Sequence, residues 1–152
     1  MRPLLERFCN CKLQERAKVY GVRIYHKGAH LIEHLDWCDT WVISATICVG
    51  RSPNGTSAGW PLVVRKSLLP GIGGEMHQVV QEAGEAVLYE GSRLYHGRPE
   101  SLRGDSYMGL FLGFTPEAYP ASARWPTQIL VTAIRRLRET IMRVLRASKA
   151  FV

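Results

Sequence analysis

The chain has few cysteines, and none of them belongs to a Cys-x-x-Cys pair. Four occur among its 152 residues, at positions 9, 11, 38 and 48. Zinc ribbons and disulfide-rich secreted domains need repeated cysteine pairs at characteristic spacings. Neither class is indicated, and the cysteines are predicted to be reduced thiols.

Long apolar runs are also missing. No segment approaches the ~18 consecutive apolar residues of a membrane-spanning helix. The first residues, Met1 to Arg7, lack the apolar core of a secretion signal. The sequence therefore predicts a soluble, cytoplasmic protein without a transmembrane segment.

The positive charge is concentrated at one end of the chain. The formal net charge is +7. From Trp125 onward there are six basic residues and one acidic residue, which leaves a surplus of only two for the preceding 124 residues. A nearly neutral body argues against a nucleic-acid groove across the domain, so no nucleic-acid partner is expected.

Strand-like runs dominate the first three quarters of the sequence. The length and the 46% apolar content fit one domain over residues 1–152. Residues 1–17 form a short lead-in of helical character, with Leu4, Leu5 and Phe8 on one side. Many short strands separated by turn residues then predict a mainly β sandwich or small barrel. The predicted strands are 18–25, 30–35, 40–49, 60–64, 76–81, 85–89, 93–96 and 106–114.

The C-terminal segment changes period. Its apolar residues, among them Leu130, Ile134, Leu137 and Ile141, recur at steps of three and four residues. This spacing predicts an amphipathic helix over 127–147, with arginines mainly on the other face. The basic helix is expected to pack on the core; the alternative is contact with an acidic partner or a membrane surface.

A possible metal site begins at His34-Leu35-Asp36. Side chains two apart on a strand point to the same side, with their backbones about 6 to 7 Å apart. An imidazole and a carboxylate so placed can share a metal ion, and His96, after another predicted strand, supplies a third ligand. Two histidines and one carboxylate leave metal positions open, the arrangement of non-haem Fe(II) oxygen chemistry.

Further motifs follow in order along the chain. They are Arg23-Ile-Tyr25-His-Lys-Gly28, His30-Leu-Ile-Glu-His34-Leu-Asp36-Trp-Cys38-Asp39, Trp41-Val-Ile-Ser-Ala-Thr-Ile, Trp60-Pro61-Leu62, Gly84-Glu-Ala-Val-Leu-Tyr89-Glu-Gly91 and Tyr95-His96-Gly97-Arg98. Over residues 18–114 this series resembles the prolyl-hydroxylase-like branch of the Fe(II)/2-oxoglutarate-dependent dioxygenases.

The resemblance implies both a fold and an activity. The fold is a double-stranded β-helix, jelly-roll or cupin-like, with the metal inside its mouth. His34, Asp36 and His96 become the ligands of Fe(II), with 2-oxoglutarate and O2 as cosubstrates. The implied reaction hydroxylates an unactivated C–H bond of a small-molecule or peptidyl substrate, with a peptidyl or free amino acid as the leading guess.

The remote carboxylate of 2-oxoglutarate needs a cation, and an arginine fork suits it best. In much of the family the basic residue comes several positions later, where this chain has Asp105, Ser106 and Tyr107. The candidates here are Arg98 and Arg103. Arg98 is favoured because it follows His96 by two residues, and the strand period aims it inward if the strand continues through Gly97.

Tyr25 matches a tyrosine that often hydrogen-bonds the cosubstrate in the family. Gly28 and Gly91 are predicted to be turn glycines with a positive φ. Two alternatives to the oxygenase stay open. One is a catalytically silent β-helix that binds a ligand or partner. The other is a zinc peptidase, because residues 30 to 34 fit His-x-x-Glu-His, which requires a helix.

Overall fold

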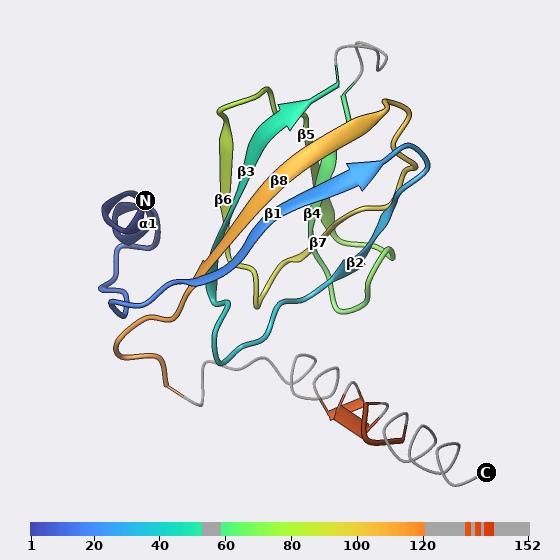
Figure 1. Cartoon of the computed structure of the whole chain (residues 1–152). Helices are drawn as coiled ribbons and strands as arrows, with labels where there is room; N and C mark the ends of the chain where they lie inside the picture. Colours follow the sequence, from blue (N-terminus) through green and yellow to red (C-terminus); the bar gives the residue numbers. More distant parts are fainter. Residues whose placement is uncertain (53–58, 121–132, 135, 138, 142–152) are drawn as a thin grey trace, which may run out of the picture. The chain divides into compact units, whose positions relative to one another are not determined.

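The computed structural model describes residues 1–52, 59–120, 133–134, 136–137 and 139–141. The chain divides into two compact units, residues 1–119 and 120–152, and each is considered by itself. Within its described residues, the first unit holds helix α1 (Arg2–Cys9) and the strands β1 to β8 (Figure 1). It is mainly β, as predicted, while the single domain over 1–152 stays a prediction.

Eight strands form two antiparallel sheets of four strands each. Each predicted strand is present, with the bounds of β8 as predicted and the ends of the others shifted by a few residues. One sheet has the order β1-β8-β3-β6 and the other β2-β7-β4-β5. The strands are β1 (Lys18–His26), β2 (Leu31–His34), β3 (Ile43–Arg51), β4 (Leu62–Lys66), β5 (Glu75–Val79), β6 (Ala86–Tyr89), β7 (Tyr95–Arg98) and β8 (Ser106–Phe114).

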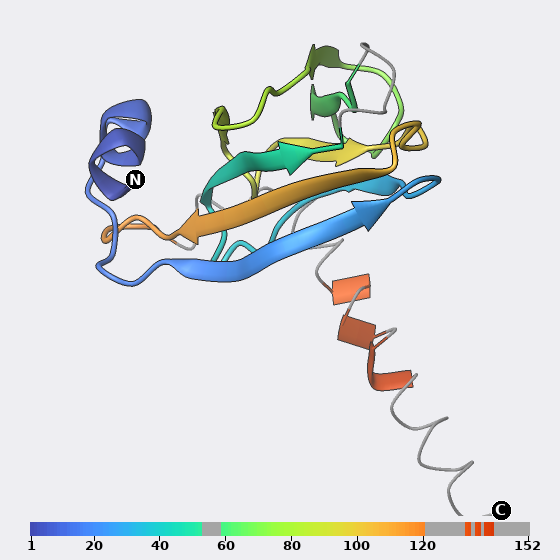
Figure 2. The ribbon, with the colours of Figure 1, turned by 45° about the horizontal axis from the view of Figure 1, so that its top comes forward.

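The chain passes from one sheet to the other at every connection except the one between β4 and β5. The two sheets lie face to face as layers (Figure 2). A hydrogen bond from Arg98 of β7 to the hydroxyl of Tyr107 in β8 crosses between them. Side chains two residues from these positions along each strand share the inner faces. This inner space holds the candidate site.

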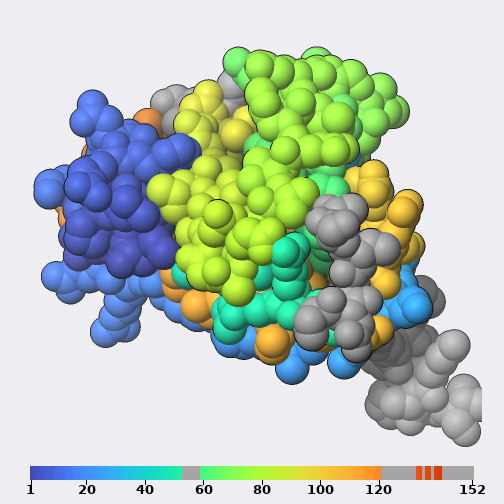
Figure 3. All heavy atoms as spheres, turned by 90° about the horizontal axis from the view of Figure 1, so that it is seen from above, coloured from blue at the N-terminus to red at the C-terminus, as the bar shows by residue number. Residues whose placement is uncertain are grey.

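Helix α1 covers part of the outer face of the β1-β8-β3-β6 sheet. Leu5 of the helix and Leu13 after it are fully buried, and they cluster with Ile43, Ala45 and Phe114 of β3 and β8. Figure 3 shows the helix in dark blue at one end of the β domain. The expected helical lead-in is therefore present and docks through Leu5, while Leu4 and Phe8 are exposed.

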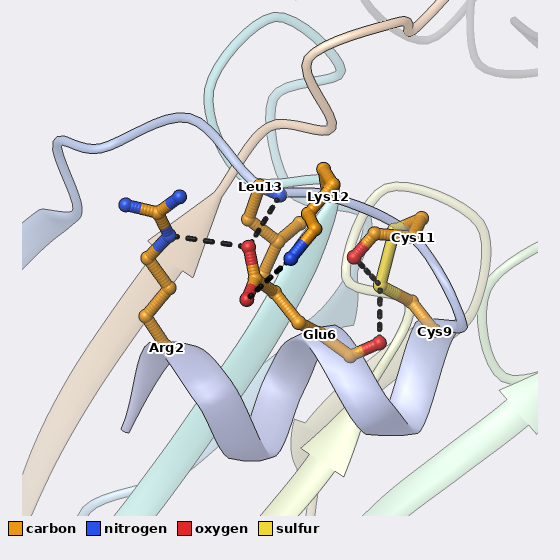
Figure 4. Close-up of a disulfide and its surroundings, with 6 residues drawn as sticks. All are labelled: Arg2, Glu6, Cys9, Cys11, Lys12 and Leu13. Atoms are coloured by element: carbon orange, nitrogen blue, oxygen red, sulfur yellow. Dashed lines mark hydrogen bonds and ion pairs between the residues drawn. A yellow bond between two sulfur atoms is a disulfide. The ribbon is translucent and has the colours of Figure 1, made fainter.

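The prediction of four reduced cysteines is wrong for one pair. Cys9 and Cys11 form a disulfide at the end of α1 (Figure 4), while Cys38 and Cys48 are buried and belong to no disulfide within the described residues. Asn10 adopts a left-handed conformation (φ 48°). This turn brings the two Cα atoms to 5.3 Å, a separation that a disulfide can bridge. Nothing in the Cys-x-Cys spacing alone indicates this conformation.

The predicted C-terminal helix over 127–147 lies largely outside the described residues. Residues 133–134, 136–137 and 139–141 are described and are helical. Among the residues described, no helix is both long and apolar enough to cross a membrane. The packing of this helix stays a prediction.

Replacing Leu5 with alanine is expected to lower the free energy of unfolding by about 2 to 5 kcal/mol. The change removes a fully buried side chain and leaves a cavity between α1 and the sheet. Leu4→Ala is the matched control, because Leu4 lies on the same helix but is 41% exposed. Its effect should stay within about 0.5 kcal/mol. Urea unfolding followed by circular dichroism measures both, and equal effects would contradict docking through Leu5.

Candidate metal centre

Strands β2 and β7 place two histidines opposite each other. They pair antiparallel with His34 directly across from His96, and the two ring centroids are 4.6 Å apart. The strands approach closely at Gly97, where a Cβ atom would lie 2.6 Å from the carbonyl oxygen of Leu31. A side chain at position 97 would therefore push β2 away from β7 and separate the two rings.

Asp36, two residues after His34, completes the cluster. Its backbone N–H donates to the carbonyl of Gly91 at 2.8 Å, which fixes the chain just after β2. Its carboxylate oxygens lie 3.9 Å from Nε2 of His34 and 3.5 Å from Nε2 of His96. One ligand atom from each of the three residues lies within 4.8 Å of the other two. The structure thus brings the predicted triad together, while its role in binding iron stays a prediction.

Both imidazoles are oriented by the backbone. Nδ1 of His34 lies 2.8 Å from the carbonyl of Ile32, and Nδ1 of His96 lies 2.9 Å from the carbonyl of Leu94. A carbonyl oxygen only accepts, so each Nδ1 carries the proton of the neutral ring and Nε2 carries a lone pair. Metal-binding histidines are commonly oriented in this way. Both Nε2 atoms face Asp36, where a shared ion would sit.

Ser44 and Gly91 border the Asp36 carboxylate. The Ser44 hydroxyl donates to Oδ2 of Asp36 at 3.1 Å. A Cβ atom at position 91 would overlap both Asp36 Oδ2 and Ser44 Oγ. The expectation of a positive φ is confirmed for Gly28 (φ 85°) but is wrong for Gly91. Glycine is needed at position 91 because no side chain fits beside the carboxylate.

The surroundings of Asp36 favour its ionised form. Burial raises the pKa of this carboxyl, but hydrogen bonding and charge interaction with His96, the charge of His34 and the Ser44 hydroxyl together lower it below the ordinary value of 3.8. The carboxylate is therefore anionic at neutral pH. Two imidazoles and one anionic oxygen form a donor set that suits Fe(II) and similar divalent ions.

The cluster is buried on one side and accessible on the other. The side chain of His96 is 4% exposed and that of His34 is 32% exposed. Tyr89 of β6 closes the buried side, with its ring centroid 4.5 Å from that of His96. Burial, with the nearby charge of Asp36, raises the pKa of Tyr89 well above its ordinary value, so the phenol stays neutral. An ion or ligand would reach the cluster from the side of His34.

Arg98 lies inside the fold, two residues after His96 on β7. The strand continues through Gly97, as the prediction required, and Arg98 is only 2% exposed. Its guanidinium donates to Gln81 Oε1 at 2.9 Å, to the Tyr107 hydroxyl at 2.7 Å and to the carbonyl of Trp60. The rings of Tyr107 and Trp60 lie 4.4 and 5.1 Å from it.

No carboxylate forms an ion pair with Arg98 within the described part of the chain. Burial lowers the pKa of Arg98, although Tyr107 and other neighbouring groups act in the opposite direction. An arginine nevertheless stays protonated in proteins. The interior therefore contains a cation whose surroundings supply neutral oxygen acceptors and aromatic faces instead of a negative charge.

Of the other two residues predicted to bind the cosubstrate, Tyr25 lies beside Arg98 and Arg103 lies elsewhere. The Tyr25 ring contacts that of Trp60, with centroids 5.1 Å apart, so Tyr25 borders the Arg98 cluster. Arg103 is exposed on the segment before β8 and does not belong to this cluster. The sequence prediction missed Ser44, Gln81 and the hydroxyl of Tyr107. These groups meet the site through contacts between segments far apart in the sequence, for which a single sequence has no local signal.

The zinc-peptidase alternative requires a helix that the structure does not have. Residues 31–34 form strand β2, and His30 is exposed. Glu33, the potential general base, is bound by Arg65 through two hydrogen bonds of 2.8 and 3.2 Å. It also accepts the backbone N–H of Gly71. Glu33 is therefore engaged in an ion pair with β4, and the helix that the peptidase alternative requires is contradicted by strand β2.

No protein-family model matches the chain, and no match is found among curated proteins.

Asp36→Asn and His96→Ala are each expected to weaken Co(II) binding by about 100-fold or more. Loss of an outer residue that only orients a ligand already costs about 10- to 100-fold, and these changes remove direct donors. His30→Ala is the matched control, because His30 is a nearby exposed histidine outside the cluster. Visible absorption of bound Co(II) measures the affinities. Unchanged affinity in the two site variants would exclude this cluster as the metal site.

Glu33→Gln should destabilise the protein without affecting metal binding. The hydrogen bonds from Arg65, which outweigh the opposing effect of burial, lower the pKa of Glu33 below its ordinary value of 4.5. Its contribution to stability is therefore present above pH 4.5 and is lost as the pH falls through the lower folded-state pKa. The variant should lose about 1.5 to 3 kcal/mol at pH 7.

The difference between Glu33→Gln and the wild type should shrink in acid, which urea unfolding at pH 7 and near pH 3 measures. Glu75→Gln is the control, because the Glu75 side chain is 72% exposed in its pair with His77. A difference that persists unchanged in acid would contradict the proposed origin of the stabilisation.

Proposed function

We propose that the protein is an Fe(II)- and 2-oxoglutarate-dependent dioxygenase that hydroxylates an unactivated C–H bond. The observation that carries this proposal is the buried Arg98, which has no carboxylate partner among the described residues and lies two residues from His96 on the same strand face. A His–Asp–His cluster alone suits several metals and roles. Such a cluster beside an inward-facing cation suits a ligand that binds metal at one end and carries a carboxylate at the other.

The strand arrangement supports a double-stranded β-helix for this core. Eight antiparallel strands in two facing sheets, with connections that repeatedly cross between the sheets, are the elements of a jelly roll. In the proposed fold the metal cluster lies between the two layers. Asp36 reaches Ser44 of one sheet while His34 and His96 come from the other.

The donor set fits ferrous iron. Two imidazoles with fixed Nε2 lone pairs and one anionic oxygen would hold Fe(II) and leave positions open for small ligands. When bound, Fe(II) with 2-oxoglutarate and O2 supplies the oxidising power that C–H hydroxylation requires. His34, Asp36 and His96 would hold the ion, while the backbone carbonyls of Ile32 and Leu94 fix the orientation of the imidazoles.

Arg98 would bind the distal carboxylate of the cosubstrate. Its guanidinium is confined between Trp60 and Tyr107, and the hydrogen bond that it donates to Gln81 Oε1 limits its rotation. Burial strengthens the attraction between a guanidinium and a carboxylate by excluding water. Tyr25 borders the same cluster through its ring contact with Trp60. The prime substrate would approach from the exposed side of His34, with a peptidyl or free amino acid as the proposed class.

Anaerobic protein mixed with Fe(II) and 2-oxoglutarate is expected to develop the visible charge-transfer band of a chelated ferrous ion. His34→Ala and Asp36→Ala should remove the band and abolish Fe(II)-dependent formation of succinate, because each deletes a donor to the ion. Circular dichroism checks that both variants remain folded. Absence of the band in folded wild-type protein would favour a silent binding module, and turnover retained by either variant would contradict the ligand assignment.

A further inference from the structure

Thr46 lies on the inner face of β3, between the metal cluster and the Arg98 cluster. Ser44, two residues before it, donates to Asp36. Cys48, two residues after it, packs with Trp60 and Tyr107, which enclose Arg98. Alternate residues of a strand point to one face, so the side chain of Thr46 shares the face of Ser44 and Cys48. It therefore occupies the stretch that joins the two clusters.

The Thr46 hydroxyl is buried and has no acceptor among the described residues. Thr46 is 0% exposed, and no hydrogen-bond partner of its Oγ1 is present in the described structure. A polar atom in this condition destabilises a fold, so native proteins seldom keep one without a reason. Ser92 Oγ and Tyr119 OH share the condition. Ser92, however, lies in the turn after β6, and Tyr119 packs against the outer cluster around α1.

Gln81 connects Thr46 to Arg98. Its Nε2 donates to the backbone carbonyl of Thr46 at 3.0 Å, while its Oε1 accepts from Arg98 at 2.9 Å. One side chain therefore fixes the position of Arg98 relative to this part of β3. His96 and Arg98 have Cα atoms about 6 to 7 Å apart along β7. A short dicarboxylate that spans from the metal to Arg98 would pass over this same stretch.

We propose that Thr46 Oγ–H donates a hydrogen bond to an oxygen of bound 2-oxoglutarate, which makes Thr46 a cosubstrate-binding residue. This inference rests on the proposed function of the site. The cosubstrate supplies the acceptor that the described part of the fold lacks, so binding satisfies the Thr46 hydroxyl. A carboxylate is the preferred acceptor for such a donor, because hydrogen bonds to charged groups are the stronger ones.

Thr46→Val tests the proposal because it exchanges the hydroxyl for a methyl group of similar shape. Calorimetric titration of 2-oxoglutarate into Mn(II)-loaded protein should show an affinity at least roughly 10-fold weaker than that of the wild type, the loss expected for a hydrogen bond to a charged group. Thr46→Ser keeps the hydroxyl and should stay within about 3-fold of the wild type. Thr115→Val is the matched control, because it removes a hydroxyl that donates a hydrogen bond to the backbone carbonyl of Asp39 away from the cluster.

A second measurement separates ligand binding from a structural role. Without metal and cosubstrate, Thr46→Val should melt at or above the temperature of the wild type, because it removes a buried group that has no partner. A lower melting temperature than that of Thr46→Ser would overturn the proposal, and so would wild-type affinity of the valine variant. If the valine variant does not fold, Thr46→Ala replaces it and must bind at least roughly 10-fold more weakly than Thr46→Ser.

The outcomes distinguish this inference from the function on which it rests. If Mn(II)-loaded wild-type protein does not bind 2-oxoglutarate, both fail. If the wild type and Thr46→Val bind it equally while Arg98→Met abolishes binding, the proposed function stands and the role of Thr46 is excluded.

Discussion

The candidate site depends on the close pairing of β2 with β7. This register sets His34 across from His96. It requires glycine at position 97, because any Cβ atom there would clash with the backbone of β2. A second close approach, at Gly91, leaves room for the Asp36 carboxylate beside Ser44. Two glycines far apart in the sequence therefore allow one three-residue cluster to form. Their role is steric, because neither position has the positive φ that usually calls for glycine.

Several polar groups lie in the interior between the sheets. Asp36, His96, Arg98, Gln81 and Thr46 all lie on or between the inner faces, where apolar side chains would stabilise the fold more simply. Part of the apolar core that stabilises the fold lies outside this space. There Leu5 and Leu13 pack on the outer face of the β1-β8-β3-β6 sheet. Stability and binding are thus divided between the two faces of one sheet: the outer face anchors α1, and the inner face carries polar groups.

Much of the fold followed from the sequence, because strand period and turn residues are local signals. The sequence predicts eight strands. The alternation of side chains along a strand also predicts that Arg98 points inward. The convergence of His34 and His96 required the register of β2 and β7, which the spacing of His34 and Asp36 does not determine. Ser44, Gln81 and Tyr107 were missed because each reaches the site across a sheet or between sheets. The Cys9–Cys11 disulfide was missed because it depends on the left-handed turn at Asn10.

The charges of the interior provide a reason to expect a dicarboxylate in particular. Asp36 carries one negative charge and Arg98 one positive charge, and they are held in separate clusters, without an ion pair between them in the described structure. A divalent cation at the His–Asp–His cluster would leave the interior with an excess of two positive charges. Buried charge of that size is costly unless it is compensated. A ligand with two carboxylates, one near the metal and one at Arg98, would neutralise the excess and place each negative charge beside a positive one. A neutral ligand, or one with a single carboxylate, would leave part of it uncompensated.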